Sequence, residues 1–190
     1  MAELKELWDL SEGAIKMITI APELANAIAA IEFLQNQNVK SAIGHTNATP
    51  EEFEAARKAG ADLITHFTNG MDKSKGSNSL FDLVMNTPDY FAEIILDGVH
   101  VQFSQASEIL AKKKARTILV TDAMAAANQP DGKYKIGDKE VLVKDSVARL
   151  ASGNNLAGST LTMDQAFSNA IFECGLQITE AVAISSSNAA

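Results

Sequence analysis

Residues 41–66 read SAIGHTNATPEEFEAARKAGADLITH and predict one complete strand–helix–strand unit. Residues 41–44 and 62–65 are short apolar runs of the kind that form buried strands. Between them, Thr49-Pro50-Glu51-Glu52 predicts the start of a helix, because a Thr N-cap with Pro at the first position and Glu at the third forms a capping box. Gly60 predicts its end, since glycine readily adopts the left-handed conformation that closes helices.

The same alternation extends in both directions along the chain. Further strands are expected at residues 16–20, 91–96 and 117–120, and further helices at 22–35, 79–86, 104–114, 162–174 and from about 180. Strands that alternate with helices favour an α/β fold with a parallel sheet. The strands are short and almost continuously apolar, which is typical of a sheet that is covered on both faces.

The alternation stops after Asp122. Residues 128–155 are expected to form a β-hairpin insertion, because short β-like runs there are separated by the turn dipeptides Gly137-Asp138 and Lys144-Asp145. A length of 190 residues suits one domain, so residues 1–190 are expected to form a single domain with this β insertion.

Composition and charge exclude several classes of function. With 46% hydrophobic and 21% charged residues, the chain is expected to form a packed core. No apolar run approaches the ~20 residues of a membrane-spanning helix, and residues 1–8 do not resemble a signal peptide. A net charge of −8 with scattered basic residues disfavours nucleic-acid binding. The single cysteine, Cys174, cannot form an internal disulfide, so a reducing, cytoplasmic setting is expected.

All three histidines lie at the ends of predicted strands. His45, His66 and His100 follow the second, third and fourth strands, and Asp122 follows the fifth. Each separation along the chain corresponds to about one strand–helix unit. Because parallel strands end at the same edge of a sheet, and at the same end of a (β/α)₈ barrel, these side chains are expected to converge. A lone buried histidine is usually structural, but three of three at strand ends favours a functional site.

This set of side chains is typical of metal-assisted hydrolysis. Two neutral imidazoles on neighbouring strands can hold a borderline-soft divalent ion such as Zn²⁺. A carboxylate nearby, here Asp122, can take a proton from a metal-bound water and later deliver it to a leaving group. The third histidine can then bind the substrate.

Motifs along the chain point to a known family. In chain order they are Ile20-Ala-Pro-Glu23, Gly44-His45-Thr-Asn-Ala-Thr49, Thr65-His66-Phe-Thr-Asn-Gly-Met71, Asp97-Gly-Val-His100-Val101, Leu119-Val-Thr-Asp-Ala-Met124 and Leu156-Ala-Gly-Ser-Thr-Leu-Thr-Met163. Together they resemble the N-acetylglucosamine-6-phosphate deacetylases of the amidohydrolase superfamily. The resemblance implies a partial (β/α)₈ TIM-type barrel of about five βα units.

The resemblance also implies a role for each matching residue. His45 and His66 would be ligands of a divalent metal, expected to be Zn²⁺, with Fe²⁺ or another divalent ion as alternatives. Asp122 would be the general base and acid. The expected contacts to the sugar phosphate are Asn69, Gly70, His100 and the backbone around Leu156, Ala157 and Gly158. The implied reaction, in amino-sugar metabolism, removes acetate from N-acetyl-D-glucosamine 6-phosphate.

The chain departs from the family in three respects. A glutamate metal ligand, carried by the family in a His-x-Glu-Gly-Pro motif, is absent. In the loop after His66, the family's phosphate-binding arginine is replaced by residues 72–77, where Lys73 or Lys75 could supply a positive charge. Five strands cannot close an eight-stranded barrel. The two outer strands could be covered by a second copy of the chain, by the first residues or by rearranged helices, and of these a homodimer is expected.

Two main hypotheses therefore stay open, with another amidohydrolase-type reaction as a weaker third. The chain is either a metal-dependent deacetylase or a catalytically inactive fragment that retains a partial metal and sugar-phosphate site. The absent glutamate ligand favours the second, because a catalytic zinc site normally has three protein ligands. A small amino-sugar phosphate is the expected partner in both cases.

Overall fold

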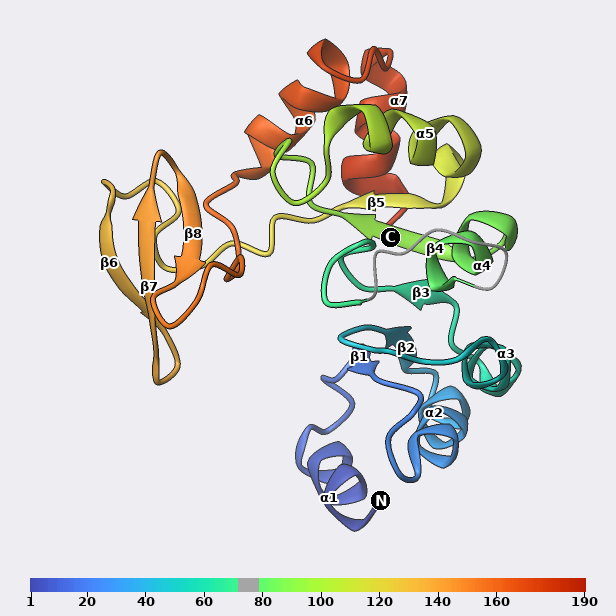
Figure 1. Cartoon of the computed structure of the whole chain (residues 1–190). Coiled ribbons are helices and arrows are strands. Elements are labelled where there is room, and N and C mark those ends of the chain that lie inside the picture. Colours follow the sequence, from blue (N-terminus) through green and yellow to red (C-terminus); the bar gives the residue numbers. More distant parts are fainter. Residues whose placement is uncertain (72–78) are drawn as a thin grey trace. The chain divides into compact units, whose positions relative to one another are not determined.

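The computed structural model describes residues 1–71 and 79–190, which form two compact units, Met1–Ala92 and Glu93–Ala190 (Figure 1). The predicted α/β fold with a parallel sheet is confirmed: five strands follow one another in the order β1-β2-β3-β4-β5. A separate antiparallel sheet has the order β6-β7-β8.

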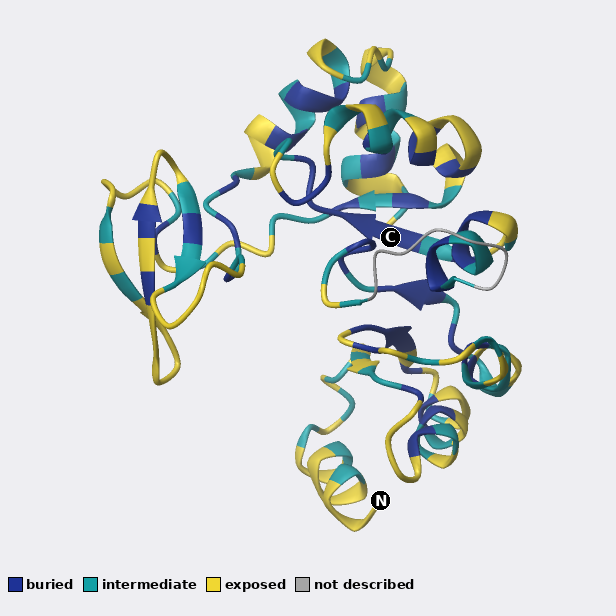
Figure 2. Ribbon diagram, viewed as in Figure 1, coloured by how far each residue is buried: buried dark blue, intermediate teal, exposed yellow. Residues whose placement is uncertain are grey.

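The first unit alternates strands and helices. Its elements are α1 (Ala2–Leu10), β1 (Met17–Ile20), α2 (Ala27–Asn36), β2 (Lys40–Ile43), α3 (Pro50–Ala59), β3 (Leu63–Ile64), α4 (Leu80–Asn86) and the start of β4 (Phe91–Ile94). Helix α2 packs against both β2 and α3. Ile31, Ile43, Phe53 and Ile64 are fully buried, and Figure 2 shows strands β2 and β3 as a buried layer.

The helix predicted from Thr49 forms as the sequence indicates. The backbone N–H of Glu52 donates to the Thr49 hydroxyl at 3.2 Å, and the backbone N–H of Thr49 donates to the Glu52 carboxylate at 2.8 Å. These two bonds complete the capping box of α3. Gly60 ends the helix in the left-handed conformation, with φ of 118°.

Helix α2 begins five residues later than the sequence predicts. Turns precede it: the backbone N–H of Leu24 donates to the carbonyl of Ala21 at 3.1 Å, and that of Ala27 donates to the carbonyl of Leu24 at 3.0 Å. Asn26 then has a φ of 66°, which a right-handed helix cannot contain. The prediction of a start at Pro22 was therefore wrong, because a proline suited to the first helical turn is equally suited to a β-turn.

The second unit contains the end of the parallel sheet and the antiparallel sheet. Its elements are the end of β4, α5 (Phe103–Lys113), a 3₁₀ turn (Lys114–Arg116), β5 (Thr117–Leu119), β6 (Gly132–Ile136), β7 (Lys139–Lys144), β8 (Val147–Leu150), α6 (Met163–Phe172), α7 (Ile178–Val182) and a π-helical turn (Ala183–Ser187). Helices α5 and α6 both contact β5. Within the described residues, no helix has the length and apolar character needed to cross a membrane.

The antiparallel sheet lies in the region where the sequence predicts β structure. Its turns form at the expected dipeptides, with Ile136 paired to Lys139 and Lys144 paired to Val147. The carboxylate of Asp131 accepts the backbone N–H groups of Asp145 at 2.6 Å and Ser146 at 3.2 Å, which fixes the second turn. A small apolar core beneath the sheet consists of Ala126, Val141, Val143, Ala148 and Ala157.

Gly44 directly follows β2, and its lack of a side chain leaves room for Thr19 and Thr65 to contact each other. A Cβ atom on Gly44 would lie 2.7 Å from Thr19 Cγ2 and 2.8 Å from Thr65 Cβ. The hydroxyls of these two threonines are 2.9 Å apart and hydrogen bonded. Any larger residue at this position would have to displace the β-branched side chains of Thr19 and Thr65, which cannot move far from the backbone that carries them.

We therefore expect Gly44→Ala to lower the free energy of unfolding by about 1–3 kcal/mol, the usual effect of overpacking. Urea denaturation followed by circular dichroism measures the change. Gly153→Ala is the matched control, because a Cβ there would meet no atom within 4 Å. Equal effects of the two substitutions would contradict the close packing described for Gly44.

Candidate functional site

The pairing of β2 with β3 places His45 and His66 side by side. Ile43 is paired with Ile64 in the parallel register, and each histidine lies two residues beyond its member of that pair. The two Nε2 atoms are 2.9 Å apart, and the rings meet edge to face with centroids separated by 4.6 Å. His66 is buried, whereas His45 is exposed. Two imidazole nitrogens directed at each other from neighbouring strands are suited to share one divalent ion.

Gly70 lies against both rings. A Cβ on this glycine would be 3.0 Å from Nδ1 of His45 and 3.2 Å from Cε1 of His66, and its φ is 60°. The Gly70 carbonyl accepts the backbone N–H of Thr46 at 2.9 Å, and the backbone N–H of Asn69 donates to the carbonyl of His66 at 2.9 Å. The structure thus brings together four of the predicted site residues, all of them in the first unit.

Three of the four predicted strand-end residues have a left-handed backbone conformation. His45, His66 and Asp122 have φ values of 50°, 33° and 48°. The left-handed region costs an L-residue about 1–2 kcal/mol. Strained residues of this kind concentrate at functional sites, where the surrounding structure holds them in place. Turn residues such as Asn38 and Asp145 also have positive φ, so this conformation alone does not identify a site, and it has no signature in the sequence.

Glu23 holds the loop that carries His45. Its Oε2 atom accepts the hydroxyl of Thr46 at 2.5 Å, and its Oε1 atom accepts the backbone N–H of Asn47 at 2.8 Å. Burial by itself would raise the pKa of Glu23, but these hydrogen bonds lower the pKa below its ordinary value. Sequence reasoning found the Ala-Pro-Glu motif but assigned no contact to this carboxylate.

The described residues contain no group of three or more His, Cys, Asp or Glu side chains arranged to hold a metal ion. Both oxygen atoms of the Glu23 carboxylate are used in holding the loop. The site in the first unit therefore offers two imidazole ligands from this chain. Lys73 and Lys75, the predicted positive charges for a phosphate group, lie outside the residues that the structure describes.

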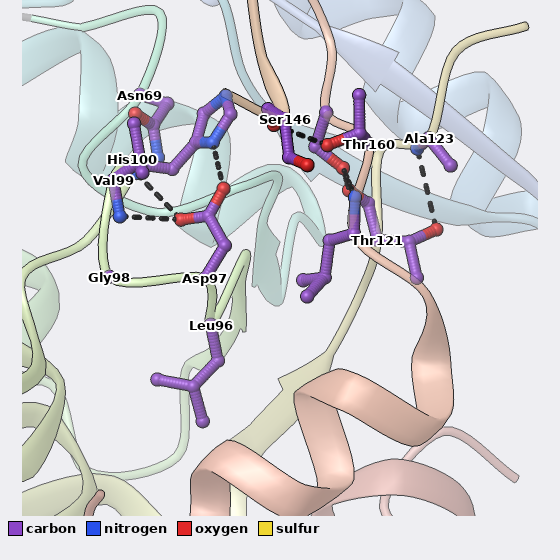
Figure 3. A network of polar contacts seen from close by, with 12 residues as sticks. Asn69, Leu96, Asp97, Gly98, Val99, His100, Thr121, Ala123, Ser146 and Thr160 are labelled. Atoms are coloured by element: carbon purple, nitrogen blue, oxygen red, sulfur yellow. Dashed lines mark hydrogen bonds and ion pairs between the residues drawn. The ribbon is translucent and has the colours of Figure 1, made fainter. Parts of the chain in front are cut away.

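In the second unit, Asp122 follows β5 and is exposed. Its carbonyl accepts the backbone N–H of Ser159 at 2.8 Å, and the carbonyl of Ser159 accepts the backbone N–H of Met124 at 2.9 Å. The Ser159 hydroxyl also donates to the carbonyl of Thr121, a residue labelled in Figure 3. Residue 159 thus binds the backbone on both sides of Asp122.

The predicted residues Leu156, Ala157 and Gly158 lead into this contact. Leu156 forms an antiparallel bridge with Arg149, and the backbone N–H of Ala157 donates to the carbonyl of Ala148 at 3.1 Å. A Cβ on Gly158 would lie 3.1 Å from the carbonyl oxygen of Asp122, so this glycine permits the close approach. The structure therefore brings Gly158 and Asp122 together, while Leu156 and Ala157 pack against β8.

His100 lies three residues after Asp97 in the same motif. The Asp97 Oδ2 atom lies 2.6 Å from Nδ1 of His100, and Oδ1 accepts the backbone N–H groups of Val99 at 2.8 Å and His100 at 2.7 Å (Figure 3). Both side chains are largely buried. Sequence reasoning selected His100 as a substrate contact but gave Asp97 no role of its own.

No family model matches the chain. Among curated proteins, N-acetylgalactosamine-6-phosphate deacetylase of Escherichia coli O157:H7 is 37% identical over 187 residues, which cover 98% of this chain and 49% of that protein. N-acetylglucosamine-6-phosphate deacetylase of Lysinibacillus sphaericus is 39% identical over 195 residues, covering 100% of this chain and 49% of that protein. The chain thus spans about half the length of these curated relatives.

Solved structures of the same kind of enzyme share the fold. A mutant N-acetyl-D-glucosamine-6-phosphate deacetylase from Mycobacterium smegmatis, in complex with N-acetyl-D-glucosamine-6-phosphate, matches with a TM-score of 0.89 and 37% identity over 96% of this chain and 49% of that chain. The N-acetylglucosamine-6-phosphate deacetylase from Thermotoga maritima matches with a TM-score of 0.88 and 36% identity over 95% of this chain and 50% of that chain.

The contacts of Glu23 generate a prediction about the loop that carries His45. We expect Glu23→Ala to speed hydrogen exchange of the Asn47 amide about tenfold, since a hydrogen bond to a charged group contributes on the order of 1.5 kcal/mol. Exchange measured by NMR tests this. Glu23→Gln is the control, because its amide oxygen still accepts from Asn47 and most of the protection should persist. Unchanged exchange in the alanine variant would show that Glu23 does not hold the loop.

Proposed function

Because the chain is a homologue of the N-acetylglucosamine-6-phosphate deacetylases and spans about half of their length, we propose that it is a metal-dependent deacetylase of the same type. The proposed reaction hydrolyses the acetamide of N-acetyl-D-glucosamine 6-phosphate to glucosamine 6-phosphate and acetate. The observation that carries the proposal is the pair of Nε2 atoms, 2.9 Å apart, at the ends of β2 and β3.

The proposed architecture is part of a (β/α)₈ barrel. Two observations support it: the five parallel strands neighbour one another in chain order, and solved deacetylases match almost the whole chain. In such barrels the active site is built at the carboxyl ends of the strands. The carboxyl ends of β2, β3, β4 and β5 are followed in the chain by His45, His66, His100 and Asp122, in that order.

The proposed metal ligands are His45 and His66. Imidazole nitrogen suits Zn²⁺ and also Fe²⁺ and related divalent ions. Such an ion, when bound, supplies Lewis-acid polarisation of the amide carbonyl and activates water for attack. Gly70 supports the pair, since its lack of a side chain lets the loop backbone approach both rings.

Asp122 is the proposed general base and acid. Its exposed carboxylate can accept a proton from the attacking water and then return that proton to the departing amine. The bonds from Ser159 to the adjacent backbone would hold Asp122 in its strained conformation during this exchange. Recognition of the sugar phosphate is assigned to Asn69, Gly70, His100 and the backbone at Leu156, Ala157 and Gly158.

A second candidate function is a catalytically inactive fragment that retains a partial metal and sugar-phosphate site. The observation that favours it is the absence, among the described residues, of any group of three metal-binding side chains. Catalytic zinc sites normally have three protein ligands. Only the deacetylase would release acetate, whereas both candidates would bind the metal and the sugar phosphate. Acetate release and ligand binding must therefore both be measured.

For the deacetylase, we expect Zn²⁺-dependent release of acetate from N-acetyl-D-glucosamine 6-phosphate, lowered by Asp122→Asn at least about 10²-fold because proton transfer is lost. Acetate is measured by a coupled assay, with the galactosamine epimer tested in parallel because one relative is named for it. Asp138→Asn is the matched control, since Asp138 is an exposed carboxylate in the turn between β6 and β7.

Zinc titration by calorimetry separates the two candidates. Zinc binding that weakens in His45→Ala, without acetate release by the unsubstituted chain, would support the inactive fragment. Neither zinc binding nor acetate release would contradict both candidates.

The proposed protein partner is a second copy of this chain. Strand β1 lies at one end of the sheet order, and its Met17 side chain is 45% exposed. Helix α1 contributes no buried residue, and its Leu10 is 73% exposed. Unpaired strand edges and apolar surface of this kind favour association.

We expect light scattering at micromolar concentration to give about twice the chain mass of 20.2 kDa. Replacing the edge residue Met17 with lysine should shift the protein towards the monomer, because a charge on an edge strand opposes pairing. Phe172→Lys is the control, since Phe172 is an exposed apolar residue on α6. A monomer of 20.2 kDa for the unsubstituted chain would contradict the homodimer.

A further inference from the structure

The carboxylate of Asp97 has a contact that the proposed reaction does not use. One oxygen, Oδ1, accepts two backbone N–H groups, from Val99 and His100, and so closes the turn after β4. The other oxygen, Oδ2, lies 2.6 Å from the ring nitrogen Nδ1 of His100 (Figure 3). The side chains of His100 and Asp97 are only 6% and 16% exposed, so solvent competes little for this bond.

We propose that Asp97 is a positioning residue that keeps the proton of neutral His100 on Nδ1 and thereby leaves the lone pair on Nε2 for a ligand. The inference rests on the proposed function only for the statement that His100 meets a ligand. The tautomer itself is a property of this chain and can be measured without turnover.

The ionisation of Asp97 supports this assignment. Burial by itself would raise the pKa of Asp97, but hydrogen bonds from the His100 ring and backbone, together with that from Val99, lower the pKa below its ordinary value. An ionised carboxylate has no hydrogen to donate. The hydrogen in the bond between Oδ2 and Nδ1 must therefore belong to the ring, which fixes the tautomer.

The surroundings keep the pair in place. A hollow of about 10 Å³ borders the two side chains, lined also by Ser146, Ser159 and Thr160. A space of this size holds one water molecule at most. A larger open pocket also borders Asp97, but its side chain is only 16% exposed, so water reaches little of the carboxylate.

The tautomer decides what the ring can recognise. With its proton on Nδ1, neutral His100 is a hydrogen-bond acceptor at Nε2. It then meets a ligand group that carries a hydrogen, whereas an ionised phosphate oxygen carries none. With the proton on Nε2, that atom would instead donate a hydrogen bond to a group such as an ionised phosphate oxygen. Asp97 therefore affects ligand recognition through His100.

A purely structural role for Asp97 makes a different prediction. Aspartate and asparagine both form turns in which the side-chain oxygen accepts backbone N–H groups one or two residues ahead. If closing the turn were the whole role, Asp97→Asn would leave His100 unchanged. If Asp97 sets the tautomer, the same substitution has a specific consequence for the ring.

The consequence follows from the number of acceptors. Asparagine has one carbonyl oxygen, and the backbone N–H groups of Val99 and His100 both require it. The amide NH₂ group then takes the place of Oδ2 and faces Nδ1 of His100 with its hydrogens. Nδ1 must become the acceptor, and the ring proton moves to Nε2.

Long-range ¹H–¹⁵N NMR of the full chain, about two pH units above the ordinary histidine pKa of ~6.5, tests the proposal. Protonated and unprotonated ring nitrogens have well-separated ¹⁵N shifts. We expect His100 to be protonated at Nδ1 in the unsubstituted chain and at Nε2 in Asp97→Asn, with unchanged circular dichroism. Gln102→Glu is a control nearby, because the side-chain amide of Gln102 donates to the Gly98 carbonyl in the same turn.

Two results would overturn the proposal. One is an Nε2-protonated ring in the unsubstituted chain, which decides the question even if Asp97→Asn does not fold. The other is an Nδ1-protonated ring in both proteins, which would leave Asp97 with the structural role alone. Neither result depends on acetate release, so failure of the proposed function would be seen separately.

Discussion

The parallel pairing of β2 with β3 is the constraint on which the candidate metal site depends. Ile43 and Ile64 are paired, and the ladder continues with a bond from the Thr65 backbone N–H to the Ile43 carbonyl at 2.8 Å. Because each histidine lies two residues beyond this pair, the register brings the segments that carry His45 and His66 to the same level. A shift of one residue would separate the rings and turn one strand's side chains to the opposite face.

The loops beyond the strands turn this register into a site. Gly44 and Gly70 allow backbone and side chains to approach more closely than any other residue would permit. Glu23 holds the loop after β2 through two hydrogen bonds, and its own position follows from the turns that delay the start of α2. Strained backbone at His45 and His66 is therefore balanced by local contacts, and the buried strands beneath provide a rigid base.

In the second unit, different contacts hold the residues that follow the strands. The residues between β8 and α6 return to β5, where Ser159 bonds to the backbone on both sides of Asp122. At the end of β4, one carboxylate, that of Asp97, both closes a turn and contacts the ring of His100. Bridges from Leu156 to Arg149 in β8 and from Ser159 to Ala123 thus lead residues 156–159 from the antiparallel sheet to the end of β5.

The sequence by itself determined the α/β class, the order of the elements, the capping box at Thr49 and the strand-end positions of the three histidines, because apolar periodicity and capping act over a few neighbouring residues. Only the tertiary structure decided the contact of Glu23 with Thr46, the meeting of Gly158 with Asp122, and the choice of a turn rather than a helix at Pro22. The first two contacts join residues far apart along the chain. The third depends on where the loop before α2 must lie in the folded chain. No local sequence pattern could therefore have specified any of the three.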